Sequence, residues 1–301
     1  MDDVSFILSS TSRLAGPLLF VALGELIAER SGALNISVEG MMLGSAFGAA
    51  LGSDLTNSPG LGIAIGVLVG LLLAAIQALL SHRLTVNQFV VGIAINILAL
   101  GLTGYLLQTY QIYPENLQKV EVPLLHDIPL VGKALFAQSA PFYLLYAVIP
   151  LVFWLIWRSR WGLEVRACGE NPTAANVTGI PVNKRRRQAV YICGLLAGYG
   201  GAYLSIGVVG QFSPNMTAGR GFIAIAAVIF GGWTLRGTVL GCLLFGGADA
   251  LRLAMPALGY ELNPQLLIAA PYLLALVAMV FFARRNRQPA ALGVTFTGGV
   301  P

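Results

Sequence analysis

Charged side chains are scarce in this chain of 301 residues. Only 10% of the residues are Asp, Glu, Lys or Arg, whereas 56% are apolar, and the mean hydropathy is +0.77. A soluble domain carries about 25% charged residues, and a surface much poorer in charge would not stay in water. The composition therefore excludes an ordinary soluble protein and requires that most of the surface face lipid.

Residue types that build catalytic and metal centres are also few. The two histidines, His82 and His126, lie far apart, and no HExxH motif is present. The three cysteines form no CxxC pair, and an odd number spread over apolar runs and one loop indicates free thiols. The sequence has no GxxxxGKS/T phosphate loop and no recognisable nucleophile triad or carboxylate pair. We therefore expect no metal site, no bound cofactor and no enzymatic activity in this chain itself.

Nine apolar runs organise the sequence. Runs of about twenty residues are long enough to cross the hydrocarbon core of a bilayer as helices, and a helix satisfies its own backbone hydrogen bonds there. The pattern predicts an all-α polytopic membrane protein with about nine transmembrane helices, in a single transmembrane domain over residues 1–301. The first two runs and the seventh are short, and we expect them to be broken or tilted. The runs are 14–29, 40–53, 60–80, 89–107, 141–157, 189–210, 221–233, 237–254 and 265–283.

Lys and Arg residues cluster in the segment 158–188 and in the tail 284–301. Cytoplasmic loops carry an excess of these residues, so both segments are expected in the cytoplasm. The same rule accounts for the net charge of +5 without a nucleic-acid partner. Four apolar runs separate the two segments, an even number that agrees with this orientation. Counting backwards places the loop 108–140 and the N-terminus outside.

The basic segment 158–188 divides the apolar runs into two sets of four. One set occupies 14–107 and the other 189–283. An odd number of crossings separates their starts, so the two sets are expected to be inverted, an architecture common among transporters.

Glycine recurs at every fourth position in several runs. Residues four apart share one face of a helix, and the absence of side chains lets two backbones approach closely. We favour close helix packing as the explanation, with the lining of a conduit as the alternative. The series are Gly40, Gly44, Gly48 and Gly52; Gly62, Gly66 and Gly70; Gly194 and Gly198; and Gly237 and Gly241.

The stretch GENPTAANVTGI, residues 169–180, carries the signals of a short helix between apolar runs. Asn171 can cap the first turn, and Pro172 suits the first helical position. Gly179 can take the left-handed conformation that ends a helix, and Glu170 lies near the positive end of the helix dipole. A helix of about seven residues is not stable alone in water, so another surface must hold it.

Two surroundings for this helix fit the residues equally well. Small apolar side chains at Ala174, Ala175 and Val177 suit insertion into a groove of another protein. Alternatively, the basic residues Arg185 to Arg187 would pin the helix to anionic headgroups at the membrane surface.

Polar residues inside apolar runs mark a candidate solute pathway, because such residues are costly in lipid and face a cavity or a partner. Gln88, Gly92 and Asn96 share one helix face. Amide side chains both donate and accept hydrogen bonds, which suits hydroxyl-rich or nucleobase-like solutes. Hydrogen bonding between helices is the alternative role for this stripe.

Two further places belong to the candidate pathway. Asn35 and Glu39 lie where the first two runs are broken, and non-helical backbone at membrane depth lines a cavity or is buried in protein. Phe222 lies at an outside-facing opening, where it would gate the path or cap the seventh run. Asp249 and Arg252 are spaced to form a structural ion pair. The candidate pathway residues are Asn35, Glu39, Gln88, Gly92, Asn96 and Phe222.

Four longer stretches carry a resemblance that covers residues 15 to 283. They read GELIAERSGALNISVEGMMLGSAFGA (24–49), VNQFVVGIAINILALGLT (86–103), RACGENPTAANVTGIPVNK (166–184) and TAGRGFIAIAAVIFGGWTLRGTVLGCLLFGGADAL (217–251). These stretches resemble permease subunits of ATP-binding-cassette (ABC) importers of the ribose and branched-chain amino-acid type, most closely the simple-sugar and nucleoside subgroup. Compared with ribose permeases, one N-terminal span is missing, as in the shorter member of a two-permease pair.

The resemblance implies a permease subunit of an ATP-driven importer in a bacterial or archaeal plasma membrane. In such permeases a short cytoplasmic coupling helix fits into a cleft on a separate ATPase chain, which binds ATP and Mg. A substrate-binding lipoprotein would deliver the solute from outside, and a longer, related permease would complete a heterodimer. The expected solute is a nucleoside, with a simple sugar second. The resemblance places ATPase coupling at Gly169, Glu170, Asn171, Pro172, Ala174, Ala175, Gly179 and Ile180.

An ion-coupled secondary transporter of a small polar solute is the alternative function. That class carries buried charge relays near the middle of the membrane. Few acidic residues lie inside the apolar runs here, and such a transporter does not need the helix at 169–180, so the importer is favoured.

Overall fold

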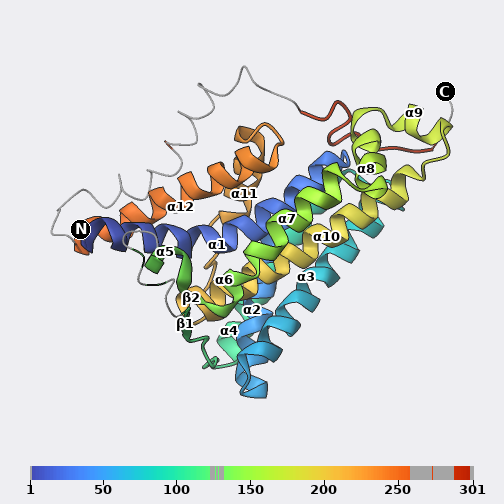
Figure 1. The fold of residues 1–301 in the computed structure, drawn as a ribbon. Coiled ribbons are helices and arrows are strands. Elements are labelled where there is room, and N and C mark those ends of the chain that lie inside the picture. Colours follow the sequence, from blue (N-terminus) through green and yellow to red (C-terminus); the bar gives the residue numbers. More distant parts are fainter. Residues whose placement is uncertain are drawn as a thin grey trace.

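The computed structural model describes residues 2–122, 126, 128, 132–257, 273 and 288–298. Nearly all of its regular structure is helical, as the composition predicts (Figure 1). The elements in chain order are α1 (Asp2–Arg30), α2 (Val38–Thr56), α3 (Pro59–His82), α4 (Gln88–Thr109), β1 (Lys119–Glu121), α5 (Gly132–Phe136), β2 (Ala137–Ser139), α6 (Ala140–Tyr143), α7 (Leu145–Trp157), α8 (Arg160–Glu170), α9 (Pro172–Val177), α10 (Val182–Ala202), the π-helix η1 (Tyr203–Val209), α11 (Arg220–Phe230) and α12 (Leu235–Ala257).

Six helices of the described part are long and apolar enough to cross a membrane. The chain is therefore an all-α polytopic membrane protein in its main architecture. Helices α2 and α11, in the second and seventh runs, are not among the six. Most of the ninth run, 265–283, lies outside the described residues, as do 284–287 and 299–301 of the tail, so the count of nine spans stays a prediction. The candidate spans are Ser5–Arg30, Pro59–His82, Gln88–Thr109, Ala140–Trp157, Val182–Val209 and Leu235–Met255.

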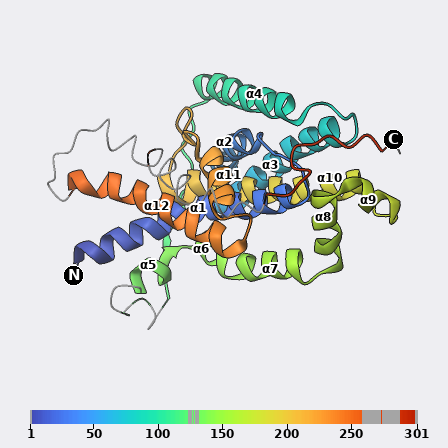
Figure 2. The ribbon, with the colours of Figure 1, turned by 90° about the horizontal axis from the view of Figure 1, so that it is seen from above.

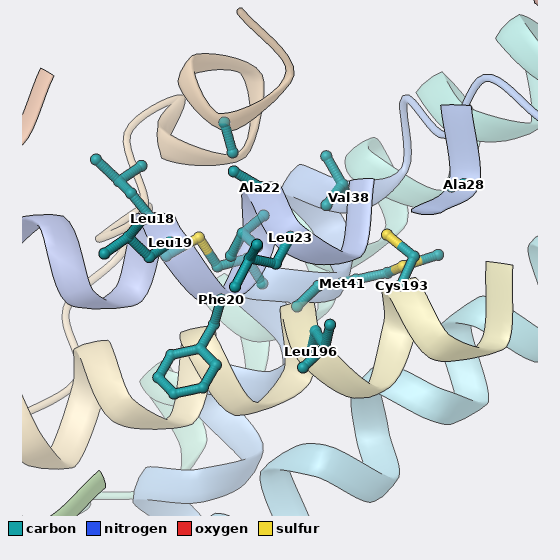
Figure 3. Packing of buried hydrophobic residues seen from close by; sticks show 14 of the residues in the cluster. Leu18, Leu19, Phe20, Ala22, Leu23, Ala28, Val38, Met41, Cys193 and Leu196 are labelled. Carbon is teal, nitrogen blue, oxygen red and sulfur yellow. The ribbon is translucent and has the colours of Figure 1, made fainter. Parts of the chain in front are cut away.

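The apolar core is centred on α1 and α10. In the most apolar stretch of each of these spans 67% of the residues are buried within the chain, against 33% in α3 and 28% in α4. Figure 3 shows α1 residues such as Leu23 in one cluster with Met41 of α2 and Leu196 of α10. Viewed from above, α4 lies at one side of this core and α7 at the other (Figure 2). The outer faces of α3 and α4 are thus left for lipid or for another subunit.

The glycine series are places of close helix packing, which confirms the favoured interpretation. A Cβ on Gly70 of α3 would lie 2.6 Å from the carbonyl oxygen of Gly194 in α10. On Gly66 it would lie 2.7 Å from the carbonyl oxygen of Ser45 in α2. Any larger residue would push these backbones apart, so the glycines allow α2, α3 and α10 to pack as one unit.

Three local features differ from the sequence-based expectation. The first apolar run is one continuous helix, α1, and the irregular backbone follows it at residues 31–37. Helix α10 begins at Val182, seven residues before its apolar run, because a helix continues past the hydrocarbon wherever its polar residues meet water or protein. The loop 108–140 also contains a short antiparallel pair that the sequence did not predict, with Lys119 opposite Ser139.

Candidate functional site

The predicted short helix at 171–179 is confirmed as α9. The side chain of Asn171 accepts a hydrogen bond from the Ala174 N–H at 2.9 Å, as an N-cap does. Pro172 lies in the first turn, and Gly179 has a φ of +86° in the left-handed region. The N–H of Ile180 then donates to the carbonyl of Ala175 at 3.0 Å, which closes the helix.

Helix α9 is held by its own chain on one side. Ala175 packs in a small apolar cluster with Cys168 at the end of α8 and Val182 at the start of α10. Phe296 from the C-terminal segment packs against the same cluster. This packing supplies the support that a six-residue helix lacks in isolation.

The opposite side of α9 is open. Val177 is 76% exposed, the largest value among the large apolar side chains of the described chain. Among the predicted ATPase-coupling residues, Glu170, Asn171, Ala174 and Gly179 are exposed, Pro172 and Ile180 are half-buried, and Gly169 and Ala175 are buried. The surface that α9 offers to another molecule therefore has Ala174 and Val177 at its centre.

Arg186 fixes the base of this segment, a role that the sequence did not reveal. Its guanidinium is fully buried and donates only to backbone carbonyls in the described chain. The partners are Ser31 after α1 at 3.1 Å, Val294 at 2.5 Å, and Cys168 and Ala291, both at 3.4 Å. One side chain of α10 thereby ties together the ends of α1 and α8 and the C-terminal segment 288–298, which lie beside one another in Figure 1.

The C-terminal segment also bonds directly to the backbone of this region. The N–H of Ala291 donates to the carbonyl of Gly169 at 2.8 Å, and the N–H of Gly293 donates to the carbonyl of Gly32 at 3.0 Å. Gly169 therefore anchors the segment from inside. These contacts make α8, α9 and the C-terminal segment one block joined to α1.

The reactivity of the Cys168 thiol shows whether this block is intact. Burial raises the pKa of its thiol, and the nearby Arg186 guanidinium opposes that rise only in part. The thiolate is the reactive form, so we expect slow maleimide labelling at neutral pH that increases at a higher pH than for an ordinary thiol. A Phe296→Ala variant should label about tenfold faster, because it removes about 1.5 kcal/mol of apolar burial from the cluster that contains the thiol.

Peptide mass spectrometry after a timed maleimide pulse measures labelling at Cys168 alone. The matched control is Val294→Ala, since that side chain is 53% exposed and is not part of the apolar cluster around Cys168. Equal labelling of the two variants would mean that Phe296 does not protect the block.

The predicted polar stripe on α4 forms hydrogen bonds with the break between α1 and α2, the irregular segment 31–37, and with the start of α2. Gln88 accepts from the N–H of Leu34 at 2.8 Å. Asn96 accepts from the N–H of Gly40 at 2.7 Å and donates to the carbonyl of Ile36 at 3.0 Å. Gly92, between them, would place a Cβ 2.9 Å from the Cβ of Ile36. The stripe thus satisfies backbone groups that the break leaves without helical partners.

Asn35 lies inside this segment and points into protein. Its backbone N–H donates to Glu25 at 3.3 Å, and its side-chain amide contacts the sulfur of Cys193 at 3.2 Å. It is fully buried. The break is consequently packed by α1, α4 and α10 together.

Glu39 joins the two halves of the chain. One carboxylate oxygen accepts from the hydroxyl of Thr217 at 2.6 Å and from the N–H of Gly219 at 2.9 Å. The other accepts from the N–H of Gly221 at 2.6 Å. The carboxylate in the first turn of α2 thereby caps the N-terminus of α11, where the helix dipole favours negative charge.

The side chains around the start of α11 complete this region. Phe222, the residue after Gly221, has a side chain that is 47% exposed. Asp249 of α12 pairs with Arg252 at 3.0 Å, as predicted, and also with Arg220 of α11 at 2.9 Å. The structure thus gathers Asn35, Glu39, Gln88, Gly92 and Asn96 around the irregular segment 31–37, and it places Phe222 in the first turn of the capped helix α11.

The fold and the site together define a membrane transport subunit. The helices form an apolar bundle, and two helix N-termini that follow irregular backbone meet through Glu39. A short capped helix has an open apolar face. The family model described as "Branched-chain amino acid transport system / permease component" matches residues 7–283. The chain belongs to this permease family.

Curated relatives are similar in sequence to this chain over most of their length. The guanosine ABC transporter permease protein NupQ of Bacillus subtilis is 34% identical over 98% of each chain. The nucleoside ABC transporter permease protein NupC of Lactococcus lactis is 33% identical over 93% of each chain. A putative glucose ABC transporter permease protein, TsgC13 of Haloferax volcanii, is 36% identical over 88% of this chain and 82% of its own.

Proposed function

We propose that this chain is the membrane-spanning permease subunit of an ABC importer that carries a nucleoside, with a simple sugar as the second candidate. Membership of the permease family and relatives named for guanosine, nucleoside and glucose transport support the class. The observation that carries the mechanism is α9, a capped helix braced from behind and open in front.

In this proposal α9 is the coupling helix. Its exposed residues Ala174 and Val177, together with Glu170 at the end of α8, enter a cleft on a separate ATPase chain, which binds ATP and Mg. Closure of the ATPases pushes on α9, and the block formed with Arg186 passes that push to the end of α1. The buried residues Gly169 and Ala175 contribute by holding the helix in place.

The solute path is proposed to run along the N-terminal ends of α2 and α11. Each of these helices follows irregular backbone that contains a left-handed glycine, Gly32 before α2 and Gly219 before α11. This correspondence supports two inverted sets around the coupling segment, as in other transporters with broken helices. Asn35, Gln88, Gly92 and Asn96 hold the wall of the path, and Glu39 joins α2 to α11. Phe222 contributes an exposed ring near the outer end.

The assembly proposed around this chain has three further proteins. They are the ATPase, a longer related permease that forms the heterodimer, and an extracytoplasmic substrate-binding lipoprotein. The coupling segment and the C-terminus face the cytoplasm, in keeping with the Lys and Arg residues there. The surrounding lipid meets the outer faces of α3 and α4.

Uptake into proteoliposomes that hold the co-expressed assembly tests the function. Guanosine and other nucleosides should accumulate only with enclosed ATP and added binding protein, and a pentose should compete weakly. Uptake driven by a sodium or proton gradient without ATP would identify a secondary transporter and refute the proposal.

A Val177→Asp variant tests the coupling role of α9. A charge at the centre of the docking surface should lower nucleoside uptake about tenfold or more, since an unpaired buried charge costs several kcal/mol at an interface. The protein should still insert normally, because Val177 touches little of its own chain. Co-purification of the ATPase and uptake are both measured.

The matched control is Leu84→Asp, the same change at a side chain 58% exposed in the turn between α3 and α4. Full uptake by Val177→Asp, or an equal loss in both variants, would contradict docking through α9. Ala175 is less suitable for this test, because it is buried by its own chain and a larger residue there would displace Phe296.

A further inference from the structure

A basic groove lies between the end of α3 and the start of α10. It encloses about 550 Å³. Leu79 and Arg83 contribute one wall from the last turn of α3 and the residue after it. The other wall is one face of α10, formed at helical spacing by Lys184, Arg187, Gln188 and Tyr191.

Three cations face this groove without an anion. In the described part of the chain, Arg83, Lys184 and Arg187 have no hydrogen-bond or ion-pair partner for their side chains. The two basic neighbours on α10 are occupied elsewhere, because Arg185 pairs with Glu164 at 2.5 Å and Arg186 is bound to carbonyls. No carboxylate lines the groove among the described residues. The local charge is therefore uncompensated by this part of the chain.

The groove lies at the level where a membrane surface would be. The candidate spans of α3 and α10 end at His82 and begin at Val182. Leu79 and Tyr191 are 43% and 39% exposed and continue the groove along the spans toward the hydrocarbon. Basic pockets between transmembrane helices at this level attract anionic lipid headgroups, and Tyr favours the interface between headgroup and chain.

We propose that this groove binds the phosphate headgroup of an anionic phospholipid, with an acyl chain passing along Leu79 and Tyr191. The lipid anchors the start of α10, one turn from Arg186, and thereby stabilises the block that carries α9. The lipid belongs to the cytoplasmic leaflet, and only this choice of leaflet rests on the proposed function. A protein partner is less suited to the groove, because its apolar side runs along the membrane-spanning part of both helices.

Binding of dioleoyl phosphatidylglycerol to the full-length chain in detergent tests the proposal, with dioleoyl phosphatidylcholine as the neutral lipid. Native mass spectrometry over a lipid titration gives the apparent affinity. Phosphatidylglycerol should bind and phosphatidylcholine should not compete. Removing two cations with Arg83→Gln/Arg187→Gln should weaken binding about 25-fold, at about fivefold for each cation near a membrane surface.

The control Arg158→Gln/Arg160→Gln removes the same charge from two exposed residues at the start of α8 and should change the affinity less than about twofold. If the groove double variant is poorly folded, Lys184→Gln alone should weaken binding about fivefold. Equal phosphatidylglycerol binding by the groove variants and the control would overturn the proposal.

Two further outcomes would also overturn it. Glycerol phosphate or inorganic phosphate binding as tightly as the lipid would identify a site for a soluble anion. Loss of a co-purified subunit in the groove variants, with lipid binding unchanged, would identify a protein interface. The lipid measurement needs no transport, so a failure of ATP-driven uptake would refute the proposed function and leave this inference standing.

Discussion

An Arg186→Leu variant should lose more than about 3 kcal/mol of stability, because a buried acceptor left without its donor costs about 1–3 kcal/mol. Four carbonyls, those of Ser31, Cys168, Ala291 and Val294, accept from this guanidinium, and the carbonyl of Ala291 also accepts from the N–H of Val294 at 3.2 Å. Losing these hydrogen bonds would leave the C-terminal segment held to the ends of α1 and α8 chiefly by the N–H groups of Ala291 and Gly293. Nucleoside uptake should fall together with the stability, since α9 would lose the support of the C-terminal segment.

Arg187→Leu is the matched control, the same change one residue along the same helix. Arg187 has no hydrogen-bond or ion-pair partner in the described chain, so in detergent without anionic lipid it should change stability by less than about 0.5 kcal/mol. The midpoint of thermal unfolding, followed by size-exclusion chromatography of heated samples, compares the two. Similar midpoints would show that Arg186 does not hold the block together.

A Glu39→Gln variant should lose about 3 kcal/mol or more, because hydrogen bonds to a charged group contribute about 1.5–3 kcal/mol each. The carboxylate accepts from three donors at the N-terminus of α11. Gln keeps the size but turns one acceptor into a donor that faces another N–H. The contact between α2 and α11 should open, and uptake should fall to background.

Asp54→Asn provides the comparison for Glu39, since it makes the same chemical change near the other end of α2. Asp54 accepts one weak bond, from the N–H of Tyr113 at 3.3 Å, and its replacement should cost less than about 1 kcal/mol. Thermal unfolding and ATP-driven uptake are measured for both. Wild-type uptake by Glu39→Gln would show that α11 does not need this cap during transport.

Much of the architecture follows from local signals in the sequence. Hydropathy along the chain predicted the helical membrane class, and every apolar run in the described residues is helical over most of its length. The cap, proline and glycine around Asn171 predicted α9 to within two residues. Glycine spacing predicted close packing. These signals act within one or two helical turns, so neighbouring residues suffice to interpret them.

Boundaries were less predictable where helices leave the hydrocarbon. The charged residues 184–187 were assigned to a loop, yet they form the first turns of α10. Hydropathy records where lipid contact ends, whereas helical hydrogen bonding continues for as long as the backbone has partners.

The sequence by itself determined the class of this protein, its packing glycines and its short capped helix. Only the tertiary structure decided which of four consecutive basic residues is buried among carbonyls, which is paired, and which two have no side-chain partner among the described residues. It also decided that Glu39 caps a helix about 180 residues away and that Phe296 covers α9. Such roles arise from contacts between distant segments, and identical side chains in sequence acquire different chemistry according to what the fold places around them.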